Sequence, residues 1–390
     1  MELAWQATTD ALARIPVPTA SPLTGGERNP LGLLATGGTF CFDPFDLYAR
    51  GQITNPNLLV LGDVGRGKST MVKTFLHRGL GEGQSLAIVD PKGEYRELGK
   101  VLGATWLAPG DTGGIDPFAG YGSSPSEVAT AVLAFISLAL GRDPTDVEKA
   151  VAAAIARHLA AERRPPSIRH LIHLCGRPSL VGAMVPTILR GEAERLMAAM
   201  GMDLERVVTG DLAGLFAVDG RTKPLPERVV IDLGAVGSGE LGALATAAIL
   251  RSRIADLALR RIGAGYVVLD EAWSVLRDGK NAASIRSLLK LSRAYGASVI
   301  AVTHRLSDLS SGARELVREC GSVSLFSQGI GEAAELQEWF GFDPLRCSLA
   351  SDLPRGRAIW LLGRREFLVD HVVKPSEAGM VDTDSRMVAR

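Results

Sequence analysis

Short, mostly apolar runs recur along the chain, and their spacing predicts a parallel sheet. Six of them are found, at residues 58–61, 85–89, 229–231, 266–269, 298–302 and 322–326. Continuous apolar runs of this length are typical of strands that are buried on both faces. Helical periodicity fills most of the intervals between the runs, so we expect right-handed βαβ units. The predicted fold class is therefore α/β, with a mainly parallel sheet.

One long stretch breaks this alternation. From residue 123 to 226 the sequence is rich in Ala, Leu and Arg at helical spacing, and β-branched runs are almost absent. Ser126 and Thr145 have the residue type and the position of helix N-caps. The pattern predicts four helices, at 127–140, 146–161, 168–175 and 180–200. We interpret 123–226 as an all-helical insertion between two strands of the sheet.

The insertion divides the rest of the chain into four parts. Residues 1–35 carry repeated Pro and Gly and are interpreted as a lead-in segment. The core then has a first part at 36–122 and a second part at 227–374, whose end predicts a β-hairpin at 358–373. Residues 375–390 have little apolar content, which favours a flexible tail.

Composition narrows the class of protein. Among 390 residues, 46% are hydrophobic and 22% are charged, which allows a large buried core and excludes wholesale disorder. Lys+Arg and Asp+Glu both number 43, so the formal net charge is zero. A generic DNA-coating protein with a large cationic surplus is therefore disfavoured, while a local basic patch stays compatible with the sequence. Weak self-repulsion also permits self-assembly.

Cysteine use and hydropathy favour a reducing, aqueous environment. The four cysteines lie far apart and form no CxxC pair, at Cys41, Cys175, Cys320 and Cys347. This spacing gives no support to a disulfide framework or a zinc knuckle. The N-terminus has no signal-peptide pattern, and the longest apolar stretches fall short of the roughly 20 residues that a bilayer span needs. The expected location is the cytoplasm, with no integral membrane segment of the chain's own.

The most specific motif follows the first apolar run. Residues 62–69 read GDVGRGKS and match the phosphate-binding pattern GxxxxGK[ST] without mismatch. A buried strand precedes the motif and a helix is predicted after it, which is the required context and disfavours a chance Gly-rich turn. Lys68 would reach the β- and γ-phosphates, and Ser69 would ligate Mg²⁺. The predicted nucleotide-binding residues are Gly62, Asp63, Val64, Gly65, Arg66, Gly67, Lys68, Ser69 and Thr70.

Two acidic residues end the apolar run at 266–269. Open α/β sheets bind ligands at the carboxyl ends of their strands, which is where Asp270 and Glu271 stand. Asp270 fits the carboxylate that holds the Mg²⁺ shell, and Glu271 fits a base that deprotonates a water for attack on the γ-phosphate. A solvated acidic turn is the alternative, and it is the weaker interpretation beside a complete phosphate-binding loop.

Two further strand ends are expected at the same edge of the sheet. The fifth apolar run leads into His304, which would contact the γ-phosphate or the attacking water; a loop histidine without a role is the alternative. The second run leads into the hexapeptide DPKGEY, which contains Asp90, Lys92 and Glu94. Taken alone it is an ordinary turn. At this edge, Lys92 and Glu94 could pair with active-site groups or with a neighbouring subunit.

Basic residues provide candidates for a contact between subunits. A helix predicted at 283–295 carries Arg293 and two other basic residues on one face. That face is either a solvated surface or the source of an arginine that stabilises charge on a neighbouring subunit's γ-phosphate. Arg355 and Arg357, in the sequence LPRGR, are rivals for this role.

Five segments together resemble the large ATPase of type IV secretion and conjugation machines, the TraC-like fourth VirB component, among the HerA/FtsK-type ring motors. They are NPNLLVLGDVGRGKS at 55–69, VDPKGEY at 89–95, VVLDEAW at 267–273, KLSRAYGASVIAVTH at 290–304 and LPRGRAIWLLGRREFLV at 353–369. DPKGEY is the most discriminating, and the resemblance covers roughly residues 36–373. There are two departures. Family members usually carry a sizeable N-terminal domain before the motor, whereas this sequence starts close to it, and they commonly have Gln where His304 stands.

The resemblance implies a RecA-like P-loop NTPase core that takes ATP and Mg²⁺ and forms a homo-oligomeric, hexameric ring with shared sites. It implies an ATP-hydrolysing motor that energises substrate translocation or pilus assembly. Its partners would be membrane components of a secretion channel, which would hold it at the inner face of the cell membrane. A DNA translocase of the coupling-protein, FtsK or HerA type is the alternative, and the basic faces permit a DNA contact. A nucleotide-dependent scaffold with little turnover is a second alternative, against which Glu271 argues.

Overall fold

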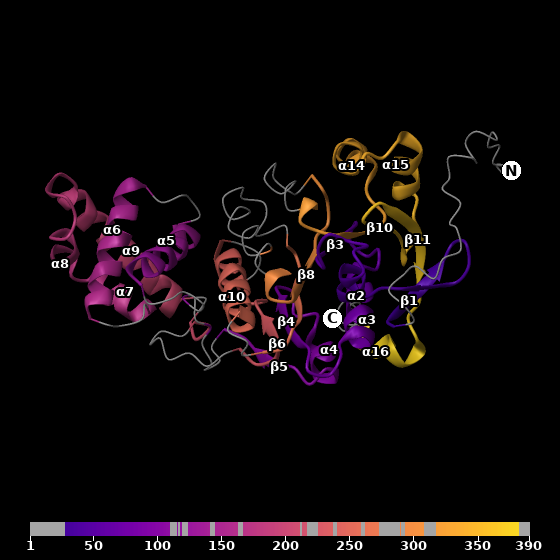
Figure 1. The fold of residues 1–390 in the computed structure, drawn as a ribbon, viewed down its shortest axis with the longest axis horizontal. Coiled ribbons are helices and arrows are strands. Elements are labelled where there is room, and N and C mark those ends of the chain that lie inside the picture. Colours follow the sequence, from indigo (N-terminus) through magenta and orange to yellow (C-terminus); the bar gives the residue numbers. More distant parts are fainter. Residues whose placement is uncertain are drawn as a thin grey trace.

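A large sheet with helices on both faces forms the body of the protein, and a group of helices lies at one end of it (Figure 1). This computed structural model describes residues 28–109, 115, 118, 124–140, 145–162, 167–210, 213–216, 225–236, 240–258, 262–272, 289, 293–307 and 317–381.

Within these residues the sheet has eleven strands, in the order β2-β1-β11-β10-β9-β3-β8-β7-β4-β6-β5. Their bounds are β1 Pro30–Leu34, β2 Thr39–Cys41, β3 Leu58–Leu61, β4 Ser85–Asp90, β5 Thr105–Leu107, β6 Arg228–Asp232, β7 Gly265–Leu269, β8 Ala297–Val302, β9 Ser322–Leu325, β10 Arg357–Leu362 and β11 Arg365–His371.

The α-helices are α2 Pro44–Ala49, α3 Lys68–Gly79, α4 Arg96–Val101, α5 Pro125–Leu140, α6 Asp146–Ala161, α7 Ile168–Cys175, α8 Pro178–Gly182, α9 Arg190–Thr209, α10 Glu240–Ala258, α14 Ala333–Phe340, α15 Pro344–Ser351 and α16 Ala378–Val381. Short 3₁₀ helices are η1 Thr187–Leu189, η2 Ile330–Glu332 and η3 Pro375–Glu377.

Most of the sheet is parallel. From β9 to β5 every neighbouring pair of strands runs parallel. Beyond β9 the strands β10, β11, β1 and β2 continue the sheet in antiparallel pairs. All six apolar runs of the sequence form strands of the parallel part, and the hairpin predicted near the end is β10–β11. The predicted α/β class with a mainly parallel sheet is confirmed.

The six parallel strands formed by the apolar runs are buried on both faces, which explains their continuous apolar sequences. Side chains alternate along a strand, so Leu58 and Val60 of β3 join the core on one face, whereas Leu59 and Leu61 join the core on the other. Helices α3 and α4 cover the first face, and α10 covers the second. The carboxyl end of β3 is thereby held rigidly between two layers.

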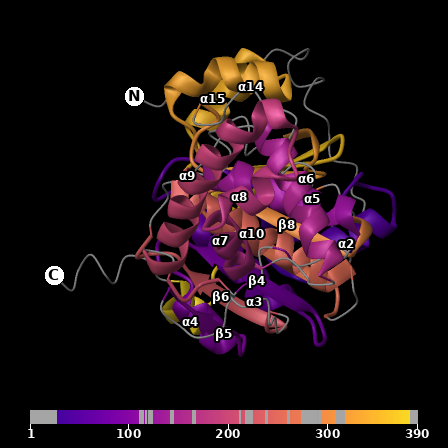
Figure 2. The same ribbon diagram turned by 90° about the vertical axis from the view of Figure 1, so that its left-hand side faces the viewer.

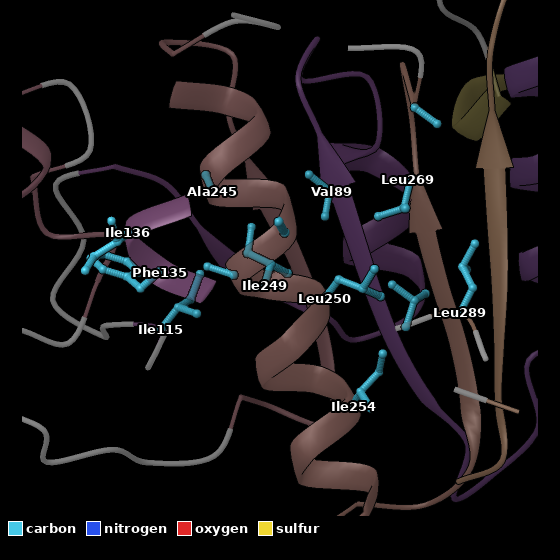
Figure 3. Packing of buried hydrophobic residues seen from close by; sticks show 14 of the residues in the cluster. Val89, Ile115, Phe135, Ile136, Ala245, Ile249, Leu250, Ile254, Leu269 and Leu289 are labelled. Carbon is cyan, nitrogen blue, oxygen red and sulfur yellow. The ribbon is translucent and has the colours of Figure 1, made fainter. Parts of the chain in front are cut away.

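The helices from α5 to α9 lie beyond α10, in front of the sheet when the molecule is viewed from that end (Figure 2). They come between β5 and β6 in the sequence. Figure 3 shows α10 between the two layers, with Phe135 and Ile136 of α5 on one side of it and Val89 and Leu269 of the sheet on the other. These side chains belong to one continuous apolar core, which joins the helical group to the sheet.

Reciprocal capping boxes begin α5 and α6. Thr145 Oγ1 accepts the N–H of Glu148 (3.3 Å), and Glu148 Oε2 accepts the N–H of Thr145 (2.7 Å). At the start of α5, Ser124 Oγ accepts the N–H of Glu127 (3.4 Å), and Glu127 Oε2 accepts the N–H of Ser124 (3.2 Å). The N-cap predicted at Thr145 is confirmed, but the one at Ser126 is wrong, because Ser126 lies inside the first turn of α5. The cap is two residues earlier, where a proline follows it at the favoured first helical position.

The single helix predicted at 180–200 is two helices. Helix α8 ends at Gly182, and α9 begins at Arg190. Between them Pro186 has ψ of 137°, outside the helical range. Proline has no N–H to donate and disfavours helical backbone in the residue before it, so one helix does not pass through this point.

Both ends of the described chain are more ordered than the composition indicates. Strand β1, inside the expected lead-in segment, pairs with β11. At the start of the expected flexible tail, η3 and α16 bury Met380 and Val381 in the core beside α3 and α4. The tail predicted at 375–390 is therefore wrong over 375–381, because these two apolar side chains dock the segment. Among the described helices, none combines the length and the hydropathy that crossing a bilayer requires.

Candidate active site

The loop between β3 and α3 needs glycine at three positions. Gly62, Gly65 and Gly67 have φ of 153°, 76° and 107°, which residues with a side chain rarely adopt. The N–H of Gly62 donates to the carbonyl of His304 at 3.1 Å, so the loop is tied to the end of the neighbouring strand β8. The loop therefore opens at the carboxyl edge of the sheet, with the first turn of α3 behind it.

Lys68, the first residue of α3, folds its ammonium back into this loop. The side chain is buried, and Nζ donates to the carbonyls of Gly62 (2.5 Å) and Asp63 (2.9 Å). Its third contact is Nδ1 of His304, at 3.0 Å. An ammonium can only donate, so Nδ1 accepts and the proton of the neutral imidazole is on Nε2. Burial lowers the pKa of Lys68 to about 8.

Asp270, directly after β7, is a buried carboxylate with one unused oxygen. Its Oδ1 accepts the N–H of Glu271 at 3.0 Å, whereas Oδ2 has no hydrogen-bond partner among the described residues. Burial, with a smaller contribution from Glu271, raises the pKa of Asp270 to about 7. A buried oxygen of this kind suits a hard divalent cation, and the hydroxyl of Ser69 in the first turn of α3 offers the same class of donor. The residues present therefore fit Mg²⁺.

Glu271 has a left-handed backbone conformation, with φ of 54°, and a crowded carboxylate. Nε2–H of His304 donates to Oε1 at 2.8 Å, and the ammonium of Lys92 forms an ion pair with the same oxygen. Burial would raise the pKa of Glu271, but the hydrogen bonds from His304 and Lys92 outweigh it and lower the pKa to about 2. An ionised carboxylate is thus linked through His304 to Lys68.

The hexapeptide after β4 brings Lys92 to this carboxylate. Oδ1 of Asp90 accepts the N–H groups of Lys92 (3.2 Å) and Glu94 (3.1 Å), and Oδ2 accepts that of Tyr95 (2.9 Å). Asp90 thereby fixes the turn. Strands β4 and β7 are neighbours in the sheet, so a loop distant in sequence reaches Glu271. Lys92 contacts Glu271, whereas Glu94 donates its backbone N–H to Asp90.

An open cavity of about 640 Å³ lies over the phosphate-binding loop. Its volume falls in the range of roughly 300–1,000 Å³ typical of small-molecule sites. Arg305, which sequence reasoning missed, forms an ion pair with Asp63 at 3.5 Å; its place directly after His304 was the available signal. The cavity is lined by Asp63, Val64, Gly65, Arg66, His304, Arg305 and Arg355.

The start of the β10–β11 hairpin docks on the same loop. The N–H of Gly356 donates to the carbonyl of Arg66 at 3.0 Å, and a Cβ on Gly67 would lie 3.4 Å from the Gly356 nitrogen. Both glycines have positive φ, 107° at Gly67 and 84° at Gly356, so the turns that bring the two backbones together favour glycine. The hairpin forms one wall of the site.

The arginines predicted for a contact between subunits lie in different places. Arg357 forms a two-point ion pair with Asp370 across the hairpin, at 2.5 and 2.7 Å. Arg293 donates to the carbonyl of Thr54 at 3.3 Å. Arg293 precedes β8, and Thr54 precedes the neighbouring parallel strand β3. Arg293 therefore lies at the sheet edge opposite the phosphate-binding loop. Most of the helix predicted at 283–295 falls outside the described residues.

Solved structures share this architecture. VirB4 of Thermoanaerobacter pseudethanolicus matches with a TM-score of 0.74 and 21% sequence identity, over 92% of this chain and 100% of that chain. The fold is similar to that of VirB4. This similarity confirms the expected RecA-like P-loop core, and with it the family resemblance at the level of the fold.

The plasmid coupling protein TrwB is a second match. It has been solved with the non-hydrolysable GTP analogue GDPNP and with ADP and Mg²⁺, and each structure matches with a TM-score of 0.57 and 17% identity, over 82% of this chain and 86% of that chain. No protein-family model and no curated protein sequence matches the chain.

Proposed function

We propose that this chain is an ATP-hydrolysing motor subunit of a type IV secretion or conjugation machine. The observation that carries the proposal is the continuous set of contacts joining Lys68, His304 and Glu271 at one edge of the sheet. The three groups follow three adjacent strands, β3, β8 and β7. The similarity of the fold to VirB4 and TrwB supports the same assignment.

Binding would use the loop and the start of α3. Backbone N–H groups of residues 62–70 and the positive end of the helix would hold the phosphates. Lys68 would exchange its two loop carbonyls and His304 for the β- and γ-phosphates, to which an ammonium binds more strongly. Ser69 and Asp270 would hold Mg²⁺, which when bound neutralises charge on the phosphate oxygens.

Hydrolysis would depend on Glu271. Its carboxylate is ionised and would accept the proton of the water that attacks the γ-phosphate. The carboxylate would become a stronger base on losing the hydrogen bonds from His304 and Lys92, which lower its pKa. His304 donates to this carboxylate and accepts from Lys68, so arrival of a phosphate at Lys68 would change the contacts of the base. This arrangement favours turnover over a scaffold that only binds nucleotide.

The motor would work as a homo-oligomeric ring, hexameric in the family it resembles. Arg293, at the sheet edge opposite its own loop, would stabilise charge on the γ-phosphate of a neighbouring subunit. Arg357 is the weaker candidate, because Asp370 already engages its guanidinium. Membrane components of a secretion channel would be the further partners, at the inner face of the cell membrane. Residues 123–226 would form a distinct helical subdomain of each subunit.

A DNA translocase is the second candidate, and the similarity of the fold to the coupling protein TrwB favours it. The zero net charge gives no general attraction to DNA, so a DNA-binding surface would have to be local. ATP hydrolysis stimulated by DNA, with a steep dependence on salt, would select this alternative.

The assay is ATP hydrolysis with Mg²⁺ by the purified full chain. Lys68→Ala should reduce turnover by roughly 10²–10³-fold, because it removes the cation that faces the phosphates. Lys100→Ala is the matched control, since Lys100 is an exposed lysine paired with Glu97 on the surface. Absence of ATP hydrolysis by the unaltered chain, or equal turnover in both variants, would contradict the proposal.

A further inference from the structure

A second, smaller cavity of about 240 Å³ lies between α3 and the end of the β10–β11 hairpin. Its floor is buried and mostly apolar, with Leu31 and Met71 only 1% and 2% exposed. Its rim includes Val372 and Val373, which are 43% and 37% exposed. The complete lining is Leu31, Gly67, Thr70, Met71, Thr74, Arg355, Gly356, His371, Val372 and Val373.

This slot is continuous with the phosphate site. Gly67 and Thr70 belong to the loop and the first turn of α3, and Arg355 lines both cavities. The γ-phosphate end of the site is fixed by Glu271 and His304, which the lining of the slot does not include among the described residues. A ligand with its phosphates on the loop would therefore direct its other end into the slot.

Neither His371 nor Thr74 gives the slot a way to distinguish one base from another, and the other two polar side chains of the lining, Thr70 and Arg355, lie where the slot meets the phosphate site. Both ring nitrogens of His371 are engaged, since Nε2 accepts from Nε1 of Trp360 (3.1 Å) and Nδ1 donates to the carbonyl of Gly356 (2.9 Å). Thr74 is 3% exposed, and its hydroxyl has no hydrogen-bond partner among the described residues. A hydroxyl can donate or accept, so it can serve either purine.

We infer that this slot binds the purine nucleoside part of the nucleotide, and that it recognises the base by apolar contact rather than by hydrogen-bond readout. The inference rests on the proposed function. The volume of the slot suits one heterocycle and its sugar. Its apolar floor and rim suit a planar aromatic base, because contact with apolar side chains removes the faces of the base from water. ATP and GTP should therefore bind similarly.

The test is calorimetric titration of the full chain, in Mg²⁺, with three ligands: the β,γ-imido analogues of ATP and GTP, and inorganic tripolyphosphate. The dissociation constants of the two analogues should lie within about fivefold of each other. Tripolyphosphate should bind at least about tenfold more weakly than either analogue. The double variant Val372→Ser, Val373→Ser should weaken both analogues about tenfold, or about 1.4 kcal/mol, and leave tripolyphosphate unchanged. Leu33→Ser is the matched control, because Leu33 is 52% exposed on β1 and does not line the slot.

Tripolyphosphate binding also reports whether the double variant is folded. If the double variant binds both analogues as the unaltered chain does, or if one purine is preferred more than about fiftyfold, the inference is overturned while the proposed function stands. If the unaltered chain binds none of the three ligands, the proposed function fails and the inference falls with it.

Discussion

Glu271 has a backbone conformation that its sequence context does not predict. Few residues other than glycine have positive φ, and such backbone conformations concentrate at functional sites. Here the unusual turn follows a buried strand directly, and it places the carboxylate where Lys92 and His304 both reach it. The carboxylate is held by two residues that follow other strands, Lys92 after β4 and His304 after β8, so the side chain has little freedom to leave the site.

Glu271→Gln is expected to separate binding from turnover. The amide keeps the shape and can still accept a hydrogen bond from His304, but it does not take a proton from water. ATP binding should persist while turnover falls by roughly 10²-fold or more. Equilibrium binding and steady-state hydrolysis, measured on the same preparation, give the two numbers. Glu97→Gln, at an exposed surface ion pair, serves as the control. Loss of binding in Glu271→Gln would make Glu271 a structural residue instead.

Substitutions of His304 test whether the contacts that join Lys68, His304 and Glu271 are needed for turnover. His304→Ala should lower turnover more than it weakens ATP binding, because the imidazole connects Lys68 to Glu271 rather than forming the phosphate loop. His304→Gln should recover much of the turnover, since one amide can accept from an ammonium and donate to a carboxylate. Single-turnover rates at saturating ATP would show this. Equal defects in both variants would mean that His304 only shapes the loop.

At the scale of elements, the capping boxes make a prediction about stability. Thr145→Ala removes the acceptor for the Glu148 N–H and should cost about 1 kcal/mol of unfolding free energy. Ser126→Ala is the matched control, because Ser126 lies inside the first turn of α5 and should change stability by less than about 0.5 kcal/mol. Urea unfolding followed by circular dichroism measures both. A loss of less than about 0.5 kcal/mol for Thr145→Ala would contradict the cap assigned to α6.

Elements with local signals were predicted well, and those defined by distant partners were not. Helices α6 and α7 match their predicted bounds because the capping residue and the apolar periodicity agree. Strand β1 was missed because Gly32 resembles a loop residue in the sequence. A Cβ there would overlap the carbonyl of Asp370 on β11, so the glycine serves a close strand contact that no local pattern reveals.

Some residues of the candidate site could likewise be predicted from local sequence, and others could not. Lys68, Asp270 and Glu271 are recognisable from residues beside them in sequence, because each follows an apolar strand. The ion pair between Lys92 and Glu271 depends on β4 lying next to β7, which is a property of strand order rather than of either segment. The role of Asp90 as the organiser of its own turn was likewise visible only once its hydrogen bonds were known.

At the scale of the whole molecule, the proposed ring with shared sites makes a prediction about mixtures. A Lys68→Ala subunit keeps Arg293 but lacks a working loop, and an Arg293→Ala subunit has the reverse defect. Mixing them should restore part of the activity, because some interfaces then pair an intact loop with an intact arginine. Such arginines contribute roughly 10³-fold or more in rate, so a minority of productive interfaces should be visible in a turnover assay.

The control for this mixture replaces the Lys68→Ala subunit with a subunit that carries both substitutions, which cannot complement. Activity per chain should also rise with protein concentration as rings form. Mixtures that show only the sum of the two defective proteins, with activity per chain independent of concentration, would describe an enzyme that works within a single chain.

The strand order also governs how the protein is made. Strand β3 leaves the ribosome early, yet its two hydrogen-bonding partners, β8 and β9, begin at Ala297 and Ser322. At translation rates of about 5–20 residues per second, this wholly apolar strand waits roughly 10–50 s for its first neighbour. Strand β1 can pair early with β2, but it waits longer still for its other partner, β11. Nascent chains of this protein should therefore depend on chaperones that shield apolar segments until β8 to β11 have been made. Ribosome-bound chains that end before Arg357 should be captured by such chaperones far more than full-length chains are.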